Sequence, residues 1–201
     1  HQHLPEERIQ PDLISALRLL KIPAPEQRVH DYPFQLSGGM RQRVVGAVAM
    51  SCRPRLLIAD EPTTALDATI QAQYLALIND VQRQTNVAII FITHDFGVVA
   101  KMCHRVGVMY AGKIVETAKT SVIFKSPSHP YTVALINSVP RLDRKNDRLY
   151  SIEGQPPSMM NLPPGCRFYP RCPSRDDICQ QQEPPEVEIA PEHTVSCWRV
   201  K

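Results

Sequence analysis

Two short apolar runs with a helical segment between them constrain the fold of this chain more than any other feature. The runs are LLIA at 56–59 and VAIIFI at 87–92, and each is typical of a buried strand. Residues 68–84 repeat their apolar side chains at helical spacing, so one face of this helix packs on a sheet. A strand, a crossover helix and a second strand make the parallel unit of α/β proteins. The sequence therefore predicts an α/β fold in which both parallel strands are fully buried.

Polar side chains follow both runs directly. Asp60 and Glu61 end the first run, and His94 follows the second. Ligands bind at the carboxyl edge of a parallel sheet, where Asp60 suits Mg²⁺ and Glu61 suits the polarisation of an attacking water. His94 is placed to contact a terminal phosphate. The alternatives are two solvated acids and a histidine that caps a strand.

The segment QLSGGMRQR at 35–43 precedes another apolar helix. Ser37 is a good N-cap, but a glycine costs about 1 kcal/mol relative to alanine inside a helix. Gly38 and Gly39 in the first turn therefore indicate that something approaches the backbone too closely for a Cβ atom. A phosphate is the natural candidate, because the free amides of a helix N-terminus bind anions. The alternative is a capped helix with a flexible entry.

Composition excludes several classes of function. Of the 201 residues, 43% are hydrophobic and 21% are charged, which is typical of a globular protein. A net charge of +3 is too small to indicate nucleic-acid binding. The longest apolar run is far shorter than the ~20 residues of a membrane span, so any membrane role is peripheral. The chain opens mid-pattern with HQHLPEER, and we expect further sequence upstream.

Four ordered motifs carry a resemblance to a known family. LSGGM, LLIADE, TALD and ITHD resemble the signature motif, Walker B motif, D-loop and H-loop of ABC-type ATPases. EPTTALDATIQAQ, RVGVMYAGKIVE and SPSHPYT are similar to segments of the ATP-binding subunits of dipeptide and oligopeptide importers. The resemblance implies the C-terminal part of an ABC nucleotide-binding domain, with a RecA-like parallel sheet and helices, followed by a proline- and cysteine-rich extension.

The same resemblance implies three segments. Residues 1–36 are expected to end the helical subdomain, 37–120 to form the RecA-like ATPase core, and 121–201 to form the C-terminal extension of peptide importers. The last segment differs in composition, because twelve of the 19 prolines follow residue 126. This shift predicts a loop-rich tail with little apolar core of its own.

ATP and Mg²⁺ are the ligands that the resemblance implies. In this family two nucleotide-binding domains face each other head to tail, and each signature loop contacts the ATP held by the other domain. The roles carried over to this chain are contact with the partner's nucleotide for Ser37, Gly38 and Gly39, Mg²⁺ binding for Asp60, polarisation of water for Glu61, support of the γ-phosphate for His94 and coupling of the two sites for Asp67.

One family motif does not occur. The sequence contains no G-x-x-x-x-G-K-[ST], and AGKIVE around Lys113 is predicted to be a hairpin turn between strands. A P-loop supplies the cradle for the phosphates and the lysine that neutralises them. We therefore expect ATP hydrolysis from the complete subunit and none from the 201-residue chain alone.

Six cysteines form two groups. Cys52 and Cys103 lie in apolar surroundings and are predicted to be small core residues. The other four have the spacing C-x5-C-x6-C-x17-C, which lacks the C-x2-C pairs of zinc sites and the runs of ferredoxins. Disulfides are not expected where intracellular thiols stay reduced. The resemblance implies a [4Fe-4S] cluster, with zinc or free thiols as alternatives, on Cys166, Cys172, Cys179 and Cys197.

The expected function is that of an ATP-binding and hydrolysing subunit that energises uptake of di- or oligopeptides from the cytoplasmic face of the inner membrane. The implied partners are a second ATPase subunit, two transmembrane permease subunits and, indirectly, an extracytoplasmic peptide-binding protein, without nucleic acid. Glutathione and nickel remain open as cargo. The alternatives are a non-transport ABC ATPase that acts on ribosomes or DNA, and an inactive truncated fragment.

Overall fold

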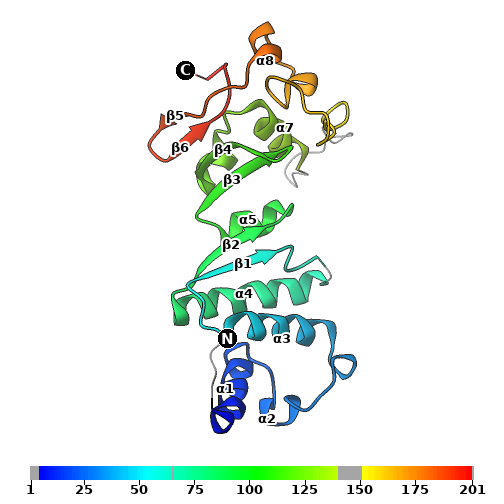
Figure 1. Cartoon of the computed structure of the whole chain (residues 1–201), viewed down its shortest axis with the longest axis vertical. Helices are drawn as coiled ribbons and strands as arrows, with labels where there is room; N and C mark the ends of the chain where they lie inside the picture. The colour runs from blue at the N-terminus through cyan, green and yellow to red at the C-terminus, as the bar shows by residue number, and fades with distance from the viewer. Residues whose placement is uncertain (1–4, 65, 140–150, 201) are drawn as a thin grey trace. The chain divides into compact units, whose positions relative to one another are not determined.

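The computed structural model describes residues 5–64, 66–139 and 151–200. The chain divides into two compact units, 1–98 and 99–201 (Figure 1). The three segments expected from the sequence remain predictions. Parts of them lie outside the described residues, namely 1–4, 65, 140–150 and 201.

The first unit holds helices and a two-stranded parallel sheet (Figure 1). Both predicted strands and the predicted helix between them are confirmed. The elements are α1 (Glu6–Leu19), α2 (Pro25–Arg28), the short 3-10 helix η1 (Pro33–Gln35), α3 (Gly38–Met50), β1 (Leu56–Asp60), α4 (Ala68–Thr85) and β2 (Ala88–Ile92), while α5 (Phe96–Met102) begins at the end of this unit.

Helix α4 has clear start and stop signals. The Asp67 carboxylate caps its N-terminus, and Asn86 ends it in the left-handed conformation, with φ of +55°. Its apolar face is buried, as the helical spacing predicts. The buried residues of this face are Tyr74, Leu75, Leu77, Ile78 and Val81.

The prediction that both strands are fully buried is wrong. The strands pair in parallel register from Leu56 opposite Ala88 to Asp60 opposite Ile92, and their side chains alternate between two faces. One face is half-buried and lines, with α3 and α4, a cavity of about 280 Å³. The other face stays exposed in the part of the chain that the structure describes. Its large apolar residues are Leu56, Ile58, Ile90 and Ile92, which are 48, 60, 48 and 49% exposed.

Two cysteines outside the tail differ from the sequence prediction. Cys52 is exposed, because α3 ends at Met50 and leaves this side chain in the turn before β1. Cys103, which follows α5, is half-buried, and burial raises the pKa of its thiol. Neither belongs to the buried core of the described residues.

The second unit is built around a four-stranded antiparallel sheet in the order β3-β4-β6-β5 (Figure 1). The hairpin predicted at AGKIVE is confirmed, and Ala111 and Gly112 at its turn have φ of +46° and +79°. The elements are β3 (Arg105–Tyr110), β4 (Lys113–Lys119), α6 (Thr120–Lys125), α7 (Pro130–Ser138), the 3-10 helix η2 (Tyr169–Arg171), α8 (Asp177–Gln181), β5 (Val187–Ala190) and β6 (His193–Val195).

The tail shares a core with the β3–β4 hairpin. Phe168 is 1% exposed and packs edge-on against Tyr110, with ring centroids 5.2 Å apart. Strand β6 pairs with β4, where Val195 lies opposite Glu116. Strands from both sides of residue 120 therefore belong to one sheet. The shared core consists of Val108, Tyr110, Val115, Ala118, Ile123 and Phe168.

Candidate functional site

Glu61 turns the chain sharply at the end of β1. Its φ is +45°, a left-handed conformation that is uncommon for a residue with a Cβ atom. Its backbone N–H donates to the carbonyl oxygen of Ile92 at 2.8 Å, which continues the pairing of the two strands by one residue. This bond holds the Glu61 carboxylate at the carboxyl edge of the sheet.

Both oxygens of the Glu61 carboxylate have a partner. The Thr64 hydroxyl donates to Oε2 at 2.8 Å, and Nδ1 of His94 lies 2.6 Å from Oε1. The hydrogen bond from Thr64 and then that from His94 lower the pKa of Glu61. The side chains of Glu61 and His94 are 39% and 79% exposed, so water reaches this ionised carboxylate. Such a group is suited to accept a proton from an attacking water.

Asp60 directly precedes Glu61 in the chain, and Asp67 follows Glu61 before α4 begins. Asp60 is the last residue of β1 and is exposed, so its carboxylate is open to a cation. The Oδ1 atom of Asp67 accepts hydrogen bonds from the backbone N–H groups of Thr69 and Ile70 at 3.0 and 2.9 Å. Asp67 therefore has a local role as the cap of α4.

The two glycines of the signature-like segment differ in their surroundings. Ser37 caps α3, as predicted, by accepting the Met40 N–H at 3.3 Å. A Cβ atom on Gly39 would lie 2.9 Å from Cγ2 of Ile70, so close packing on α4 requires this glycine. A Cβ atom on Gly38 would meet no described atom within 4 Å. Of these two glycines, only Gly38 has an open side that an incoming ligand can approach.

Two glutamines form hydrogen bonds between the elements around Glu61 and His94. No sequence pattern predicts these two residues. Gln42 on α3 donates to the carbonyl oxygen of Pro62 at 2.8 Å. Gln71 on α4 donates to Oδ2 of Asp95 at 3.0 Å, and Asp95 caps the start of α5. Thr64 has a weak sequence signal, a hydroxyl three residues after the acid that it contacts.

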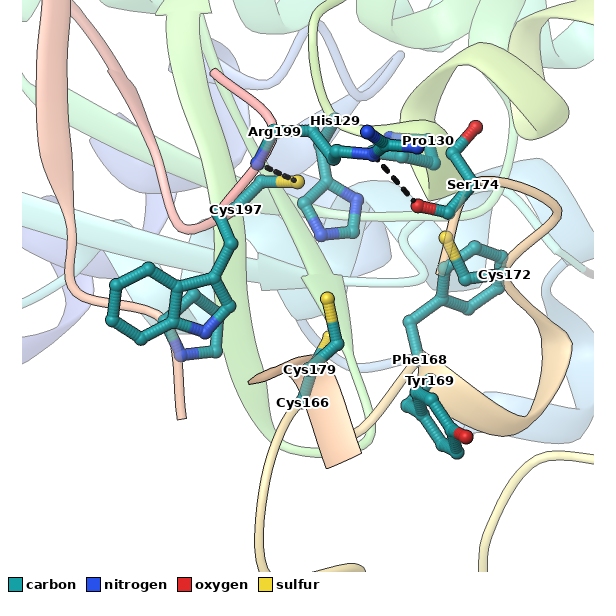
Figure 2. Close-up of a pocket in the computed structure, with 12 residues that line it drawn as sticks. His129, Pro130, Cys166, Phe168, Tyr169, Cys172, Ser174, Cys179, Cys197 and Arg199 are labelled. Carbon is teal, nitrogen blue, oxygen red and sulfur yellow. Dashed lines mark hydrogen bonds between the residues drawn. The ribbon is translucent and has the colours of Figure 1, made fainter. Parts of the chain in front are cut away.

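The four tail cysteines come together in the second unit. They line one pocket with His129, Phe168 and Trp198, and Figure 2 shows sulfur atoms directed into it. The backbone N–H of Cys166 donates to the carbonyl oxygen of Cys179 at 2.8 Å, which joins the first and third cysteines. A Cβ atom on Gly165 would lie 2.4 Å from that carbonyl oxygen, so only glycine allows this approach.

The environment of three of the tail thiols favours their protonated form. Burial raises the pKa of Cys166, Cys172 and Cys197, and neighbouring thiols raise it further for each of the three. All six cysteines of the chain are free. Within 5–64, 66–139 and 151–200, no three His, Cys, Asp or Glu side chains are placed to hold a metal ion.

Two family descriptions match this chain. Residues 3–64 match "ABC transporter", and residues 115–179 match "Oligopeptide/dipeptide transporter, C-terminal region". A solved structure titled as cbiO1 of Clostridium perfringens, part of the ABC transporter complex cbiONQ, is similar in fold. It has a TM-score of 0.55 and 30% identity, with coverage of 63% of this chain and 49% of that one.

Curated relatives are similar over most of this chain. The dipeptide transport ATP-binding protein DppD of Bacillus subtilis is 50% identical, with coverage of 98% of this chain and 59% of the relative. The oligopeptide transport ATP-binding protein OppD of Salmonella typhimurium is 48% identical, with coverage of 92% and 55%. OppD of Escherichia coli is 45% identical, with coverage of 99% and 59%. The chain thus spans less than two thirds of the length of these relatives. No described helix is long and apolar enough to cross a membrane.

Proposed function

We propose, for a chain that belongs to the family of ABC transporter ATP-binding proteins, that the complete protein hydrolyses ATP to drive the import of dipeptides or oligopeptides. The observation that carries this proposal is the Glu61–His94 pair at the carboxyl edge of β1 and β2. An ionised carboxylate beside an imidazole in reach of water suits the activation of a water for attack on a phosphate. The names of the peptide-transport relatives support the cargo.

The surrounding residues have proposed roles in holding ATP and Mg²⁺. Asp60 would bind Mg²⁺, because its exposed carboxylate immediately precedes Glu61. Ser37, Gly38 and Gly39 would meet the γ-phosphate of a nucleotide held by a second ATPase subunit. The capped start of α3 and the open side of Gly38 support this contact. Asp67 would couple the two sites from the start of α4.

The proposed assembly is that of a membrane transporter, and the relatives' names as transport ATP-binding proteins support it. The protein would lie peripherally on the cytoplasmic face of the inner membrane with a second ATPase subunit and two transmembrane permease subunits. An extracytoplasmic peptide-binding protein would deliver the cargo to the permease. Closure of the two ATPase subunits on ATP would switch the transport path between its two faces.

The test is ATP hydrolysis by the complete subunit assembled with its permease. Glu61→Gln keeps the size of the side chain and removes its charge, so turnover should fall by about 10² to 10⁴ while ATP-driven closure survives. Glu7→Gln, on the exposed surface of α1, is the matched control and should keep normal turnover. Normal turnover in Glu61→Gln would contradict the proposal. The 201-residue chain alone should show no turnover, and a steady rate abolished by Glu61→Gln would contradict that expectation.

The tail carries a second part of the proposal, a metal centre on Cys166, Cys172, Cys179 and Cys197. A [4Fe-4S] cluster is the favoured occupant and zinc is the alternative, because four soft thiolates suit both. The shared pocket supports the donor set. The free space of the pocket is about 10 Å³, roughly the room of one water. Binding of a cluster therefore requires the cysteine side chains to rotate away from the centre of the pocket. When bound, the centre would cross-link the tail, and an iron centre would also exchange an electron.

Metal analysis of protein prepared without oxygen tests this centre. We expect iron with a brown colour and absorption near about 400 nm, or colourless protein with zinc. Cys172→Ser should lose the metal, whereas Cys52→Ser, on an exposed turn of the first unit, should keep it. Less than one iron and less than one zinc per chain, with all four tail thiols titrating freely, would contradict the proposal.

A further inference from the structure

Gln42 lies in the second turn of α3, and its side chain reaches the turn that follows β1. Its Nε2 group donates to the carbonyl oxygen of Pro62 at 2.8 Å. Proline has no backbone N–H, so this carbonyl is the only backbone group of Pro62 that can form a hydrogen bond. Pro62 is buried, and a buried carbonyl without a partner is costly. Gln42 therefore satisfies a buried polar group directly after Glu61.

The amide of Gln42 has a second partner on α4. It forms a hydrogen bond with the hydroxyl of Tyr74, a residue that is 5% exposed. Burial raises the pKa of Tyr74, and this hydrogen bond opposes the rise. An amide nitrogen carries two N–H groups, which is enough for the Pro62 carbonyl and the Tyr74 hydroxyl together. One side chain of α3 is thus joined both to α4 and to the turn after β1.

The turn that Gln42 contacts runs from Glu61 to Thr64. Glu61 has φ of +45°, and its N–H donates to the Ile92 carbonyl oxygen at 2.8 Å. The Thr64 hydroxyl donates to Oε2 of Glu61 at 2.8 Å. Pro62 lies between Glu61 and Thr64 in the chain, so a displacement of its carbonyl would move the backbone that carries both side chains. The position of the Glu61 carboxylate therefore depends on how this peptide is held.

A second glutamine holds the next residue of the turn. Nε2 of Gln71 on α4 donates to Oγ1 of Thr63 at 3.4 Å, and Thr63 is 7% exposed. This contact and the bond from the Glu61 N–H do not involve α3, so both remain when the amide of Gln42 is removed. Loss of that amide should therefore shift the acid without unfolding the first unit.

We propose that Gln42 is a positioning residue for Glu61, which fixes the water-activating acid relative to the helix that carries the signature-like segment. The inference rests on the ATPase function proposed above. In that proposal the start of α3 meets the nucleotide held by a second subunit, and Glu61 acts on the nucleotide of its own subunit. The Gln42–Pro62 bond links these two parts, so the placement of the acid depends on the placement of α3.

Gln42→Met tests this role in the complete subunit assembled with its permease. Methionine is unbranched like glutamine but has no N–H group, so both hydrogen bonds are lost with little change in packing. Turnover of ATP should fall by about tenfold, the effect of one lost hydrogen bond to a buried carbonyl. The KM for ATP and ATP-dependent dimerisation should be unchanged, because Glu61 acts in the transition state.

Tyr74→Phe is the matched control. It removes the other partner of the amide from the same contact between α3 and α4, but it leaves the Gln42–Pro62 bond in place. Its turnover should equal that of the wild type. Turnover reduced equally in Tyr74→Phe and Gln42→Met would assign the effect to packing of the two helices and overturn the inference.

A double variant shows whether Gln42 acts through Glu61. In Glu61→Gln the charged acid is absent, so the addition of Gln42→Met should not lower the residual single-turnover rate any further. A second loss of about tenfold in the double variant would show that Gln42 acts independently of the acid, which would overturn the inference.

The remaining outcomes separate this inference from the proposed function. A raised KM or weaker dimerisation in Gln42→Met would place Gln42 in the nucleotide contact of α3 instead, and would overturn its role toward Glu61. Normal turnover in Glu61→Gln would overturn the proposed function and this inference with it. Low turnover in Glu61→Gln together with normal turnover in Gln42→Met would overturn this inference only.

Discussion

Nδ1 of His94 lies 2.6 Å from Oε1 of Glu61, although 33 residues separate the two along the chain. The parallel register of β1 and β2 places Asp60 opposite Ile92, so the residues that follow each strand meet at one edge. The Glu61 N–H bond to the Ile92 carbonyl holds them there. The acid and the histidine are therefore brought together by strand pairing.

Thr64 is expected to act as a positioning residue for Glu61. In the wild type, the Thr64 hydroxyl donates to Oε2 of Glu61, and this hydrogen bond lowers the pKa of Glu61. Thr64→Val removes the hydroxyl. The pKa of Glu61 should rise, so the acid limb of the pH–rate profile should move to higher pH. Turnover of ATP by the complete subunit should fall by about threefold to tenfold, in proportion to one lost hydrogen bond, with an unchanged KM for ATP.

Thr64→Ser provides the matched control, because it keeps the hydroxyl. It should restore both the turnover and the position of the acid limb. A Val variant with the wild-type pH profile would show that Thr64 does not influence the ionisation of Glu61.

Gly38 and Gly39 should respond differently to alanine. Gly39→Ala puts a Cβ atom 2.9 Å from Cγ2 of Ile70, so the first unit should lose about 1–3 kcal/mol in its free energy of unfolding. Gly38→Ala meets no described atom within 4 Å and should not lower stability. If a phosphate approaches Gly38 from a second subunit, the same substitution should nevertheless weaken ATP-dependent dimerisation.

Urea unfolding and ATP-dependent dimerisation of the complete subunit check these two substitutions. The double variant Gly39→Ala with Ile70→Ala removes the close contact and should lose less stability than the sum of its two single variants. Normal dimerisation of Gly38→Ala would leave the open side of this glycine without a role in nucleotide contact.

His129 should make the second unit less stable in acid. Burial lowers the pKa of His129 to about 4 from its ordinary 6.5, against the opposing charge of Glu116. Below pH 6.5 the His129 imidazole binds a proton in the unfolded chain, whereas in the folded chain it does so only near pH 4. The free energy of unfolding therefore falls as the pH is lowered from 6.5 to 4. Between pH 7 and pH 5 the loss from this group should be about 2 kcal/mol.

Urea unfolding followed by the fluorescence of Trp198, the single tryptophan of the chain, measures this loss. The Asn variant of His129 has no imidazole to protonate, so its loss between pH 7 and pH 5 should be smaller by about 2 kcal/mol. Equal losses in the two proteins would show that other groups cause the acid sensitivity.

Gly165 should be among the least replaceable residues of the tail. Gly165→Ala would place a Cβ atom 2.4 Å from the Cys179 carbonyl oxygen, and a backbone atom in α8 does not yield as a side chain does. The second unit should lose stability by at least about 2 kcal/mol. Gly107→Ala in β3 makes only an ordinary contact of 3.5 Å with Ile114 and should be tolerated. Thermal unfolding that is equal for the two variants would contradict this expectation.

The sequence by itself determines the local elements and the order of the chemical groups. The apolar periods predict β1, α4 and β2, and Ser37 is identifiable as a cap, because periods and caps depend on residues that are close along the chain. It also predicts that Glu61 and His94 share an edge, since parallel strands place their carboxyl ends together. The spacing of the tail cysteines, in contrast, does not predict their arrangement.

Only the tertiary structure decides which residues far apart along the chain meet. It sets Gly39 against Ile70, leaves one face of β1 and β2 exposed, and packs Phe168 of the tail on the β3–β4 hairpin. It also directs the buried Glu116 carboxylate to the backbone of His129, and so places an imidazole beside the four thiols. None of these contacts has a periodic signature, because each depends on packing and on the burial of polar groups between segments whose spacing in sequence carries no information about their distance in space.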